Sequence, residues 1–429
     1  MRPFINHASR SLLIVLDRFR WVFCQLDTLR RCMPSSIRKA LDGLPITLDD
    51  TYERMLQGIP KEKSEHASRL FQCMVAALRP LRVEELAELF AIEFGANNVP
   101  NLVAGWRPEN PEEAVLSTCS SFITIIDDDD NGNDDEGSKI VQFSHFSVKE
   151  YLTSDRLQMS NIGSINQYYI PLEPAHVILA QACVTVLLQM DKKQDEEGLR
   201  ALPLGSYAID HWARHARFGD VASRIEDSLA YLFNPNMPYF NPQILFQCVR
   251  GMHDAYPQQP AFISSEPDKV TPLFLAAFCG FSGLAKHLII THALDVNAEC
   301  GDRFSPIHGA SDNGLVDTAH TLLDNGANVN ARGYNDRTPL HYASHYGYPR
   351  LAQLLIKQGA HLNARASFQD TPLHVASENG QLEVVRVLLD HGTDVHVRGD
   401  DDLTPYQIAT QHGHHDVAQL LLTHGAERE

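Results

Sequence analysis

One short motif recurs along the C-terminal part of the chain at an almost constant spacing. A threonine or serine followed by proline occurs five times, at intervals of 34, 33, 33 and 33 residues, with the prolines at Pro272, Pro306, Pro339, Pro372 and Pro405. A glycine follows each proline by eight residues, and a pair of leucine or isoleucine residues follows by sixteen and seventeen. Self-similarity at this period restricts the fold to stacked copies of one supersecondary unit.

Each position of the motif has a structural role. The threonine or serine oxygen can cap the free amides at a helix start, and proline fits the first helical position because no amide is needed there. Gly347 and its counterparts supply the left-handed residue that ends a short helix. The pair Leu355 and Ile356 and its counterparts mark a second helix that packs on the neighbouring copy. The sequence therefore predicts a unit of turn, helix, helix and turn.

These residues resemble the ankyrin repeat over residues 266–429, with copies at about 268–300, 301–334, 335–367, 368–400 and 401–429. The resemblance implies an α-solenoid of five repeats that binds a protein partner on its concave face and has no chemistry of its own. It also puts three histidines at a structural position where the imidazole ties adjacent turns together, namely His308, His341 and His374.

Positions that differ between the copies are where this resemblance puts partner contacts. Exposed aromatic side chains beside polar groups suit protein binding, whereas the alternative is that these side chains are merely solvated. The turn candidates are Phe304, Tyr334, Asn335, Arg337, Phe368, Asp370, Asp400 and Asp401. The helix-end candidates are Asp312, Asn313, His345, Tyr346, Glu378, Asn379, Gln411 and His412.

The first half of the chain alternates amphipathic and β-branched segments. Residues 48–160 are predicted to form a winged-helix-like module, and residues 161–265 a helical connector with Trp212 as an anchor. Within the module, apolar periodicity predicts helices over Leu48–Leu56, Lys63–Leu78, Val83–Phe94 and Pro111–Cys119, and strands over Phe122–Ile126 and Ile140–Phe143. The whole chain is therefore expected to be mainly α.

Several stretches over about residues 15–250 resemble the C-terminal part of fungal NACHT-type, NLR-like ATPases that carry ankyrin arrays. They include the segments Phe19–Asp27, Thr51–Arg54, Phe143–Leu152 and His211–Phe218. Such ATPases need a phosphate-binding loop with a Gly-Lys dipeptide, and this sequence contains no Gly-Lys. We therefore expect residues 1–47 to be a remnant helical segment after a missing nucleotide-binding core, and expect no ATPase activity.

Other signals favour ordinary structural roles. The loop from Asp127 to Ser138 lacks the glutamate that closes a calcium site, so it is interpreted as a solvated hairpin. The predicted helix Val83–Phe94 carries four glutamates and no basic residue, which would repel DNA. Ser144, His145 and Ser147 lack a nucleophile elbow. No catalytic, cofactor-binding or metal-binding residue is therefore assigned.

Charge and cysteine content narrow the function further. Lysine and arginine total 36 against 54 aspartate and glutamate residues, a net charge of −18 that disfavours nucleic acid and anionic membranes. The eight cysteines are scattered, as in a reducing compartment. We expect a non-enzymatic adaptor in the cytoplasm or nucleus that binds a protein and neither nucleic acid, membrane nor small-molecule substrate. The alternatives are a transcription co-regulator or pathway-cluster accessory protein, and the C-terminal fragment of an NLR-like signalling ATPase.

Overall fold

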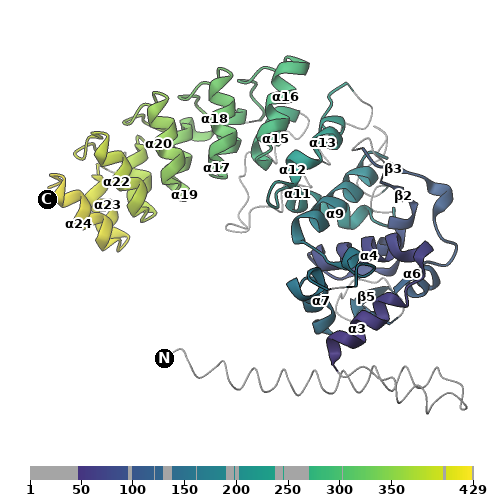
Figure 1. The fold of residues 1–429 in the computed structure, drawn as a ribbon. Coiled ribbons are helices and arrows are strands. Elements are labelled where there is room, and N and C mark those ends of the chain that lie inside the picture. The colour runs from purple at the N-terminus through teal and green to yellow at the C-terminus, as the bar shows by residue number, and fades with distance from the viewer. Residues whose placement is uncertain are drawn as a thin grey trace, which may run out of the picture. The chain divides into compact units, whose positions relative to one another are not determined.

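The computed structural model divides the chain into two compact units, Met1–Thr185 with Leu202–Tyr207, and Val186–Ala201 with Ala208–Glu429 (Figure 1). It describes residues 47–94, 99–119, 121–128, 138–160, 162–189, 198, 202–236, 245, 270–301, 303–399 and 402–427. The predicted remnant 1–47, apart from Thr47, lies outside the described residues, as do most of the loop between Asp127 and Ser138 and most of the proline-rich stretch before the repeats.

The first unit combines helices with a small antiparallel sheet. The sheet has the order β1-β5-β4, formed by β1 (Leu81–Arg82), β5 (Lys139–Phe143) and β4 (Ile123–Asp127). A second pair joins β2 (Ile92–Glu93) to β3 (Asn101–Leu102). The helices are α3 (Leu48–Gln57), η2 (Lys61–Lys63), α4 (Ser64–Ala76), α5 (Val83–Ala87), η3 (Glu88–Ala91), η4 (Ala104–Trp106), α6 (Pro111–Cys119), α7 (Phe146–Leu152), α8 (Asp155–Gln158), η5 (Asn166–Tyr168) and all but the last two residues of α9 (Leu172–Leu187).

Aromatic side chains form the core of this unit. Tyr52 of α3 lies 5.3 Å from Tyr151 and 6.2 Å from Phe122, measured between ring centroids. Phe71 of α4 lies 5.3 Å from Phe122 at an edge-to-face angle and 6.2 Å from Tyr168. Offset and edge-to-face pairs of this kind add to the free energy of burying the rings. They join helices and strands that are far apart in the sequence.

The predicted helix over Val83–Phe94 is wrong in its length. The α-helix ends at Ala87, a 3₁₀ turn follows, and the chain then enters β2. Two of the four glutamates are almost fully buried and paired with arginine, because Glu85 accepts hydrogen bonds from Arg79 at 2.6 and 2.8 Å and Glu88 accepts from Arg107. Two of the four carboxylates that were expected to repel DNA are therefore buried and paired with arginine. The helix directly before the β4–β5 hairpin is α6, which also contains glutamates and no basic residue.

The second unit contains the repeats. Five helix pairs follow one another, and in each pair the first helix belongs to an inner layer and the second to an outer layer (Figure 1). The inner layer is α15 (Pro272–Cys279), α17 (Pro306–Asp312), α19 (Pro339–Tyr346), α21 (Pro372–Glu378) and α23 (Pro405–Gln411). The outer layer is α16 (Ser282–His292), α18 (Val316–Asp324), α20 (Pro349–Lys357), α22 (Leu382–Asp390) and α24 (His415–Thr423).

Connector helices precede the first pair within the same unit. Most of α11 (Gly205–Ala216), α12 (Val221–Arg224) and all of α13 (Glu226–Leu232) belong to it, and α13 contacts α16. Trp212 is fully buried, with ring centroids 6.0 Å from Phe233 and 6.0 Å from Phe281. The expected anchoring role of Trp212 is confirmed, because its ring bridges the connector and the first repeat.

Buried histidines join successive copies of the repeat. The Nδ1 of His341 accepts the amide of Thr338 at 3.1 Å and lies 2.8 Å from the threonine Oγ, while its Nε2–H donates to the carbonyl of Asp370 in the next copy at 3.1 Å. His374 makes the same set of contacts, with the carbonyl of Leu403 in the next copy, whereas Nε2–H of His308 donates to the carbonyl of Ala331 at 3.1 Å and also faces the backbone of Arg337 in the next copy. The predicted role of these three histidines is confirmed. In the last copy Gln407 replaces histidine and its side-chain oxygen accepts the amide of Thr404 at 2.8 Å.

A second series of bonds runs along the turns. The Nδ2 of Asn330 donates to the carbonyl of Gly359 at 3.1 Å, and its Oδ1 accepts the amide of His361 at 2.8 Å. Arg332 donates to the carbonyl of Arg365 at 2.9 Å, and Arg365 donates to that of Arg398 at 3.2 Å. Each bond links one copy to the next. The array is therefore tied together by polar contacts as well as by its helix packing.

Acid should weaken the array through its histidines. Burial lowers the pKa of His308 and of His341 from 6.5 to about 4, so both imidazoles are neutral in the folded chain. The stability that depends on this neutral form is complete above pH 6.5 and is lost as the pH falls toward about 4. For each such histidine, we expect the free energy of unfolding to fall by up to about 1.4 kcal/mol per pH unit in this window.

The matched variant is His341→Gln, because glutamine already occupies this position in the last copy. The variant should fold at neutral pH. Its free energy of unfolding should depend less steeply on pH, because about one proton fewer is taken up when the chain unfolds in acid. Urea unfolding at several pH values measures the slope for both chains. An identical slope in the two chains would contradict the assignment of this histidine.

Candidate functional site

The candidate partner-binding residues lie on two parts of the repeats, the hairpin turns before the inner helices and the C-terminal ends of those helices. Tyr334 and Phe368 are 44% and 56% exposed. Glu378, Gln411 and His412 are exposed as well. The half-buried candidates are Asn313, Asn335, Arg337, His345, Tyr346, Asp370 and Asn379. We call these twelve residues the recognition face.

Short hydrogen bonds fix the turns that present the aromatic residues. The amide of Gly333 donates to the carbonyl of Arg337 at 2.9 Å across one turn, and that of Ala366 donates to Asp370 at 3.0 Å across the next. One turn is bonded to the other, because the amide of Ser367 donates to the carbonyl of Asn335 at 2.8 Å. Tyr334 and Phe368 therefore project from turns that hydrogen bonds hold in place.

The turns also contain residues in the left-handed region that favours glycine. Arg303, Asp336, Gln369 and Asp402 lie 33 residues apart and have φ angles of 62°, 55°, 58° and 60°. An L-residue pays roughly 1–2 kcal/mol in this conformation. The surrounding bonds hold the backbone there in every one of these four turns.

The inner helices place a second group of polar side chains between the copies. The ring of His345 lies 4.6 Å from that of Tyr346, its Nδ1 is 3.2 Å from Nδ2 of Asn379, and its carbonyl accepts from Gln381 at 3.1 Å. Burial lowers the pKa of His345, which keeps the imidazole neutral. This part of the face is a network of neutral hydrogen-bonding groups.

Two predicted contact residues are corrected by the structure. Phe304 is fully buried because its ring packs against two rings of the array, with its centroid 5.3 Å from that of His308 and 5.5 Å from that of Tyr342. Asp312 is 1% exposed, and its carboxylate accepts a hydrogen bond from the hydroxyl of Tyr346. Both residues belong to the interior and cannot contact a partner. Asp400 and Asp401 lie outside the described residues.

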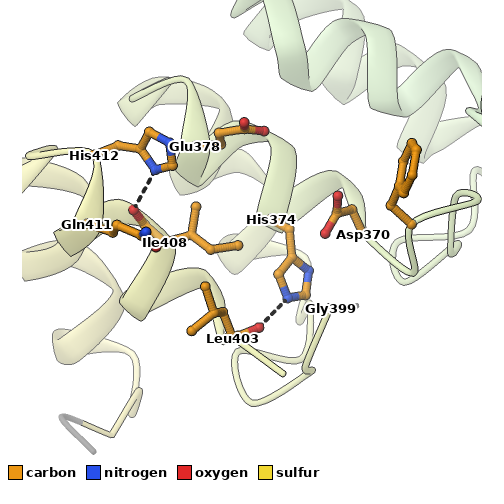
Figure 2. A pocket seen from close by; sticks show the side chains of 9 residues that line it. Asp370, His374, Glu378, Gly399, Leu403, Ile408, Gln411 and His412 are labelled. Carbon is orange, nitrogen blue, oxygen red and sulfur yellow. Dashed lines mark hydrogen bonds between the residues drawn. The ribbon is translucent and has the colours of Figure 1, made fainter. Parts of the chain in front are cut away.

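A pocket of about 330 Å³ lies between the fourth and fifth inner helices (Figure 2). Five predicted residues line it, namely Phe368, Asp370, Glu378, Gln411 and His412. The pocket also includes four residues that sequence reasoning missed, namely His374, Gly399, Leu403 and Ile408. Leu403 occupies the same position in its copy as Arg337 and Asp370 in theirs, directly before the capping threonine, so the repeat register could have identified it.

The pocket histidines are engaged in structural bonds. His374 uses Nδ1 for Thr371 and Nε2 for the carbonyl of Leu403, and the Nδ1–H of His412 donates to the carbonyl of Ile408 at 3.1 Å (Figure 2). Neither ring lies beside a serine or cysteine nucleophile that would form part of this pocket. Across the part of the chain that the structure describes, no group of three or more potential metal ligands comes together.

The Ser–His contact considered in the sequence lies in the first unit. Ser147 Oγ is 2.6 Å from Nδ1 of His145 and 2.8 Å from the hydroxyl of Tyr52. The same Nδ1 accepts the amide of Ser147, so His145 is the N-cap of α7. This geometry explains the pair as a helix cap.

Among the described helices, none is long and apolar enough to cross a bilayer.

The helix pairs and the recognition face define a repeat protein of the solenoid class, with an extended surface formed by turns and inner helices. Residues 273–366 and 340–428 match the family model of ankyrin repeats, so the C-terminal part of the chain is an ankyrin array. The predicted ankyrin identity and the mainly helical fold class are both confirmed.

One curated protein with a similar sequence is the azaphilone pigments biosynthesis cluster protein L of Monascus ruber. It is 27% identical over 288 residues, which cover 64% of this chain and 58% of that protein. The chain therefore spans less than two thirds of the length of this relative. Neither comparison names a NACHT-type protein, so that resemblance stays a prediction.

Two phenylalanines test the distinction between core and surface. Phe304→Ala should lower the free energy of unfolding by about 3–5 kcal/mol, because the ring is fully buried. Phe368→Ala should change it by no more than about 0.5 kcal/mol, because that ring is 56% exposed. Urea denaturation followed by circular dichroism measures both values. A comparable loss in the two variants would show that Phe304 is not the core residue described here.

Proposed function

We propose that this chain is a non-enzymatic scaffold that binds a protein partner through the recognition face. The observation that carries the proposal is the pairing of two exposed aromatic rings, Tyr334 and Phe368, with half-buried polar side chains on successive inner helices. Aromatic anchors beside polar groups are the usual composition of energetically important interface positions.

Rigidity supports the same proposal. The turns that present Tyr334 and Phe368 are bonded to each other and to the histidine-linked helix starts. A surface that is already ordered loses little conformational entropy when it binds, so more of the contact free energy appears as affinity. A cytoplasmic or nuclear location is part of the same proposal.

Site-specific photo-crosslinking tests which face of the array binds. Benzoylphenylalanine is introduced at Phe368 in one chain and, as a control, at Ile290 of α16, which is 65% exposed in the outer layer. We expect an adduct with a discrete partner in extracts of the source cells from position 368 and none from position 290, because only the first position lies on the recognition face.

Two further results complete this experiment. The adduct at position 368 should weaken strongly when Tyr334 is changed to alanine in the same chain, since both rings belong to the same face. Equal adducts at positions 290 and 368, or an adduct only at 290, would contradict binding by the recognition face.

A second candidate is an accessory protein of a biosynthetic gene cluster, including one that acts as a transcription co-regulator through another DNA-binding protein. The observation that favours it is the name of the relative from Monascus ruber, a pigment cluster protein that aligns with 64% of this chain. The acidic net charge of −18 argues for an indirect rather than a direct contact with DNA. Here the scaffold would hold pathway proteins or a regulator together.

Gene deletion in the source organism tests this candidate. We expect one family of secondary metabolites to decline in the deletion strain, and the full-length gene to restore it, whereas a copy carrying Tyr334→Ala and Phe368→Ala should restore less. Liquid chromatography with mass spectrometry measures the products. An unchanged profile, under conditions in which neighbouring biosynthetic genes are transcribed, would rule the accessory role out.

A further inference from the structure

We propose that the open edge of β4 binds an extended segment of a partner protein that carries a basic residue at its N-terminal end. Among the described residues, β4 is paired with β5 on one side and with no strand on the other, because the sheet order is β1-β5-β4. A strand edge of this kind can add a further strand from another chain. The site lies in the first unit, so this inference goes beyond the recognition face and does not rest on it.

The register of the hairpin decides which backbone groups lie on the open edge. The amide of Ser144 donates to the carbonyl of Phe122 at 2.8 Å, so these two residues form a hydrogen-bonded pair of the β4–β5 ladder. Hydrogen-bonded and non-hydrogen-bonded pairs alternate along an antiparallel ladder. The amides and carbonyls that point away from β5 are therefore those of Ile123, Ile125 and Asp127.

The second half of this edge is accessible. Ile126 is 41% exposed, Asp127 is exposed and Ile125 is half-buried. The outward backbone groups of Ile125 and Asp127 make no hydrogen bond with the described residues. An added strand would pair these groups and would cover part of the apolar surface of Ile126.

The charges at the C-terminal end of β4 favour a basic partner. Lys139 lies opposite Asp127 in the ladder and bonds to Glu112 of α6 at 2.7 Å. The pKa of Lys139 is raised by this hydrogen bond and by the nearby carboxylates of Asp127 and Glu84. Three carboxylates therefore act on one ammonium, which leaves an excess of negative charge. A second copy of β4 in antiparallel pairing would place Ile123 opposite Asp127, and this would not balance the charge.

The direction of the added strand follows from the sheet. β5 is antiparallel to both β1 and β4, and antiparallel pairs are slightly more stable per residue than parallel ones. In an antiparallel complex the N-terminal residue of the added strand lies opposite Asp127, where a lysine or arginine forms a cross-strand ion pair. A β-branched residue two positions later lies opposite Ile125. The expected ligand thus begins with a basic residue and continues with β-branched residues.

Methyl NMR of the full chain with synthetic peptides tests the inference without any knowledge of the partner. The δ1 methyl of Ile126 is the reporter, assigned by Ile126→Val, and that of Ile290 in the second unit is the reference. The probe is Lys-Val-Val-Thr-Val with blocked termini, and the reversed peptide Val-Thr-Val-Val-Lys has the same composition. We expect a saturable shift at Ile126 and none at Ile290, with about two- to fivefold weaker binding of the reversed peptide.

Two N-methylated forms of the probe test the backbone pairing. A methyl group on the nitrogen of the third residue removes the donor that would face Ile125, whereas one on the fourth residue faces away from β4. The first peptide should bind about tenfold or more weakly than the probe. The second should bind like the probe, because it loses no bond to β4.

Asp127→Asn tests the charge. The variant should bind the probe about two- to fivefold more weakly, and should bind a peptide with glutamine in place of lysine as well as the unchanged chain does. Asp155→Asn is the matched control, because Asp155 is an exposed carboxylate of α8 and lies outside the sheet. It should leave the binding of both peptides unchanged.

The outcomes separate this inference from its alternatives. Equal binding of the two N-methylated peptides, or of the probe and its reverse, would overturn the pairing inferred here. The absence of a saturable shift would overturn it as well, because the edge would then be closed to other chains. A shift at Ile126 that depends only on the concentration of the protein would identify a second copy as the occupant instead. A failed crosslink at position 368 would overturn the proposed scaffold function alone, because the peptide titration does not use the recognition face.

Discussion

The bond between a buried imidazole and the next copy of the repeat is the contact on which the array depends. In each central copy one nitrogen of the histidine closes the start of a helix. The other nitrogen of His341 and of His374 donates to a carbonyl of the next copy, 29 residues further along the chain, and that of His308 donates to Ala331, 23 residues further along. Local and long-range structure are therefore set by one side chain. Because the imidazole joins two turns at hydrogen-bond distance, it holds the copies that it links at a fixed spacing.

The recognition face uses the same bonds. Asp370 shows this most directly, since its carbonyl receives the bond from His341 while its side chain lines the pocket. A residue that completes the framework thus also presents a charge to the surface. This arrangement lets side chains differ between the turns without loss of the backbone geometry, because the repeated contact is made by a main-chain atom.

The fold of the repeats could be predicted in detail because each signal is local: cap, proline, glycine and apolar pair lie within one copy. Burial could not be predicted in the same way. Phe304 and Asp370 share one register, yet only Phe304 is fully buried, because its ring packs edge-to-face against Tyr342 of the next copy. In the first unit, β1 has two residues, too few to give a periodic pattern. Likewise, the pairing of Glu85 with Arg79 depends on the path of the chain between the end of α4 and the start of α5, which composition does not reveal.

The left-handed turns have an evolutionary consequence. Arg303, Asp336, Gln369 and Asp402 occupy a conformation in which glycine would avoid a cost of about 1 kcal/mol at each turn. A chain with glycine at all four positions would avoid this cost but would lose four side chains from the turns, including those that form the Arg303–Asp336 and Arg398–Asp402 ion pairs. The array therefore exchanges some of its thermal tolerance for chemical variety at its turns, and each of these positions can change its side chain while the helices beneath remain the same.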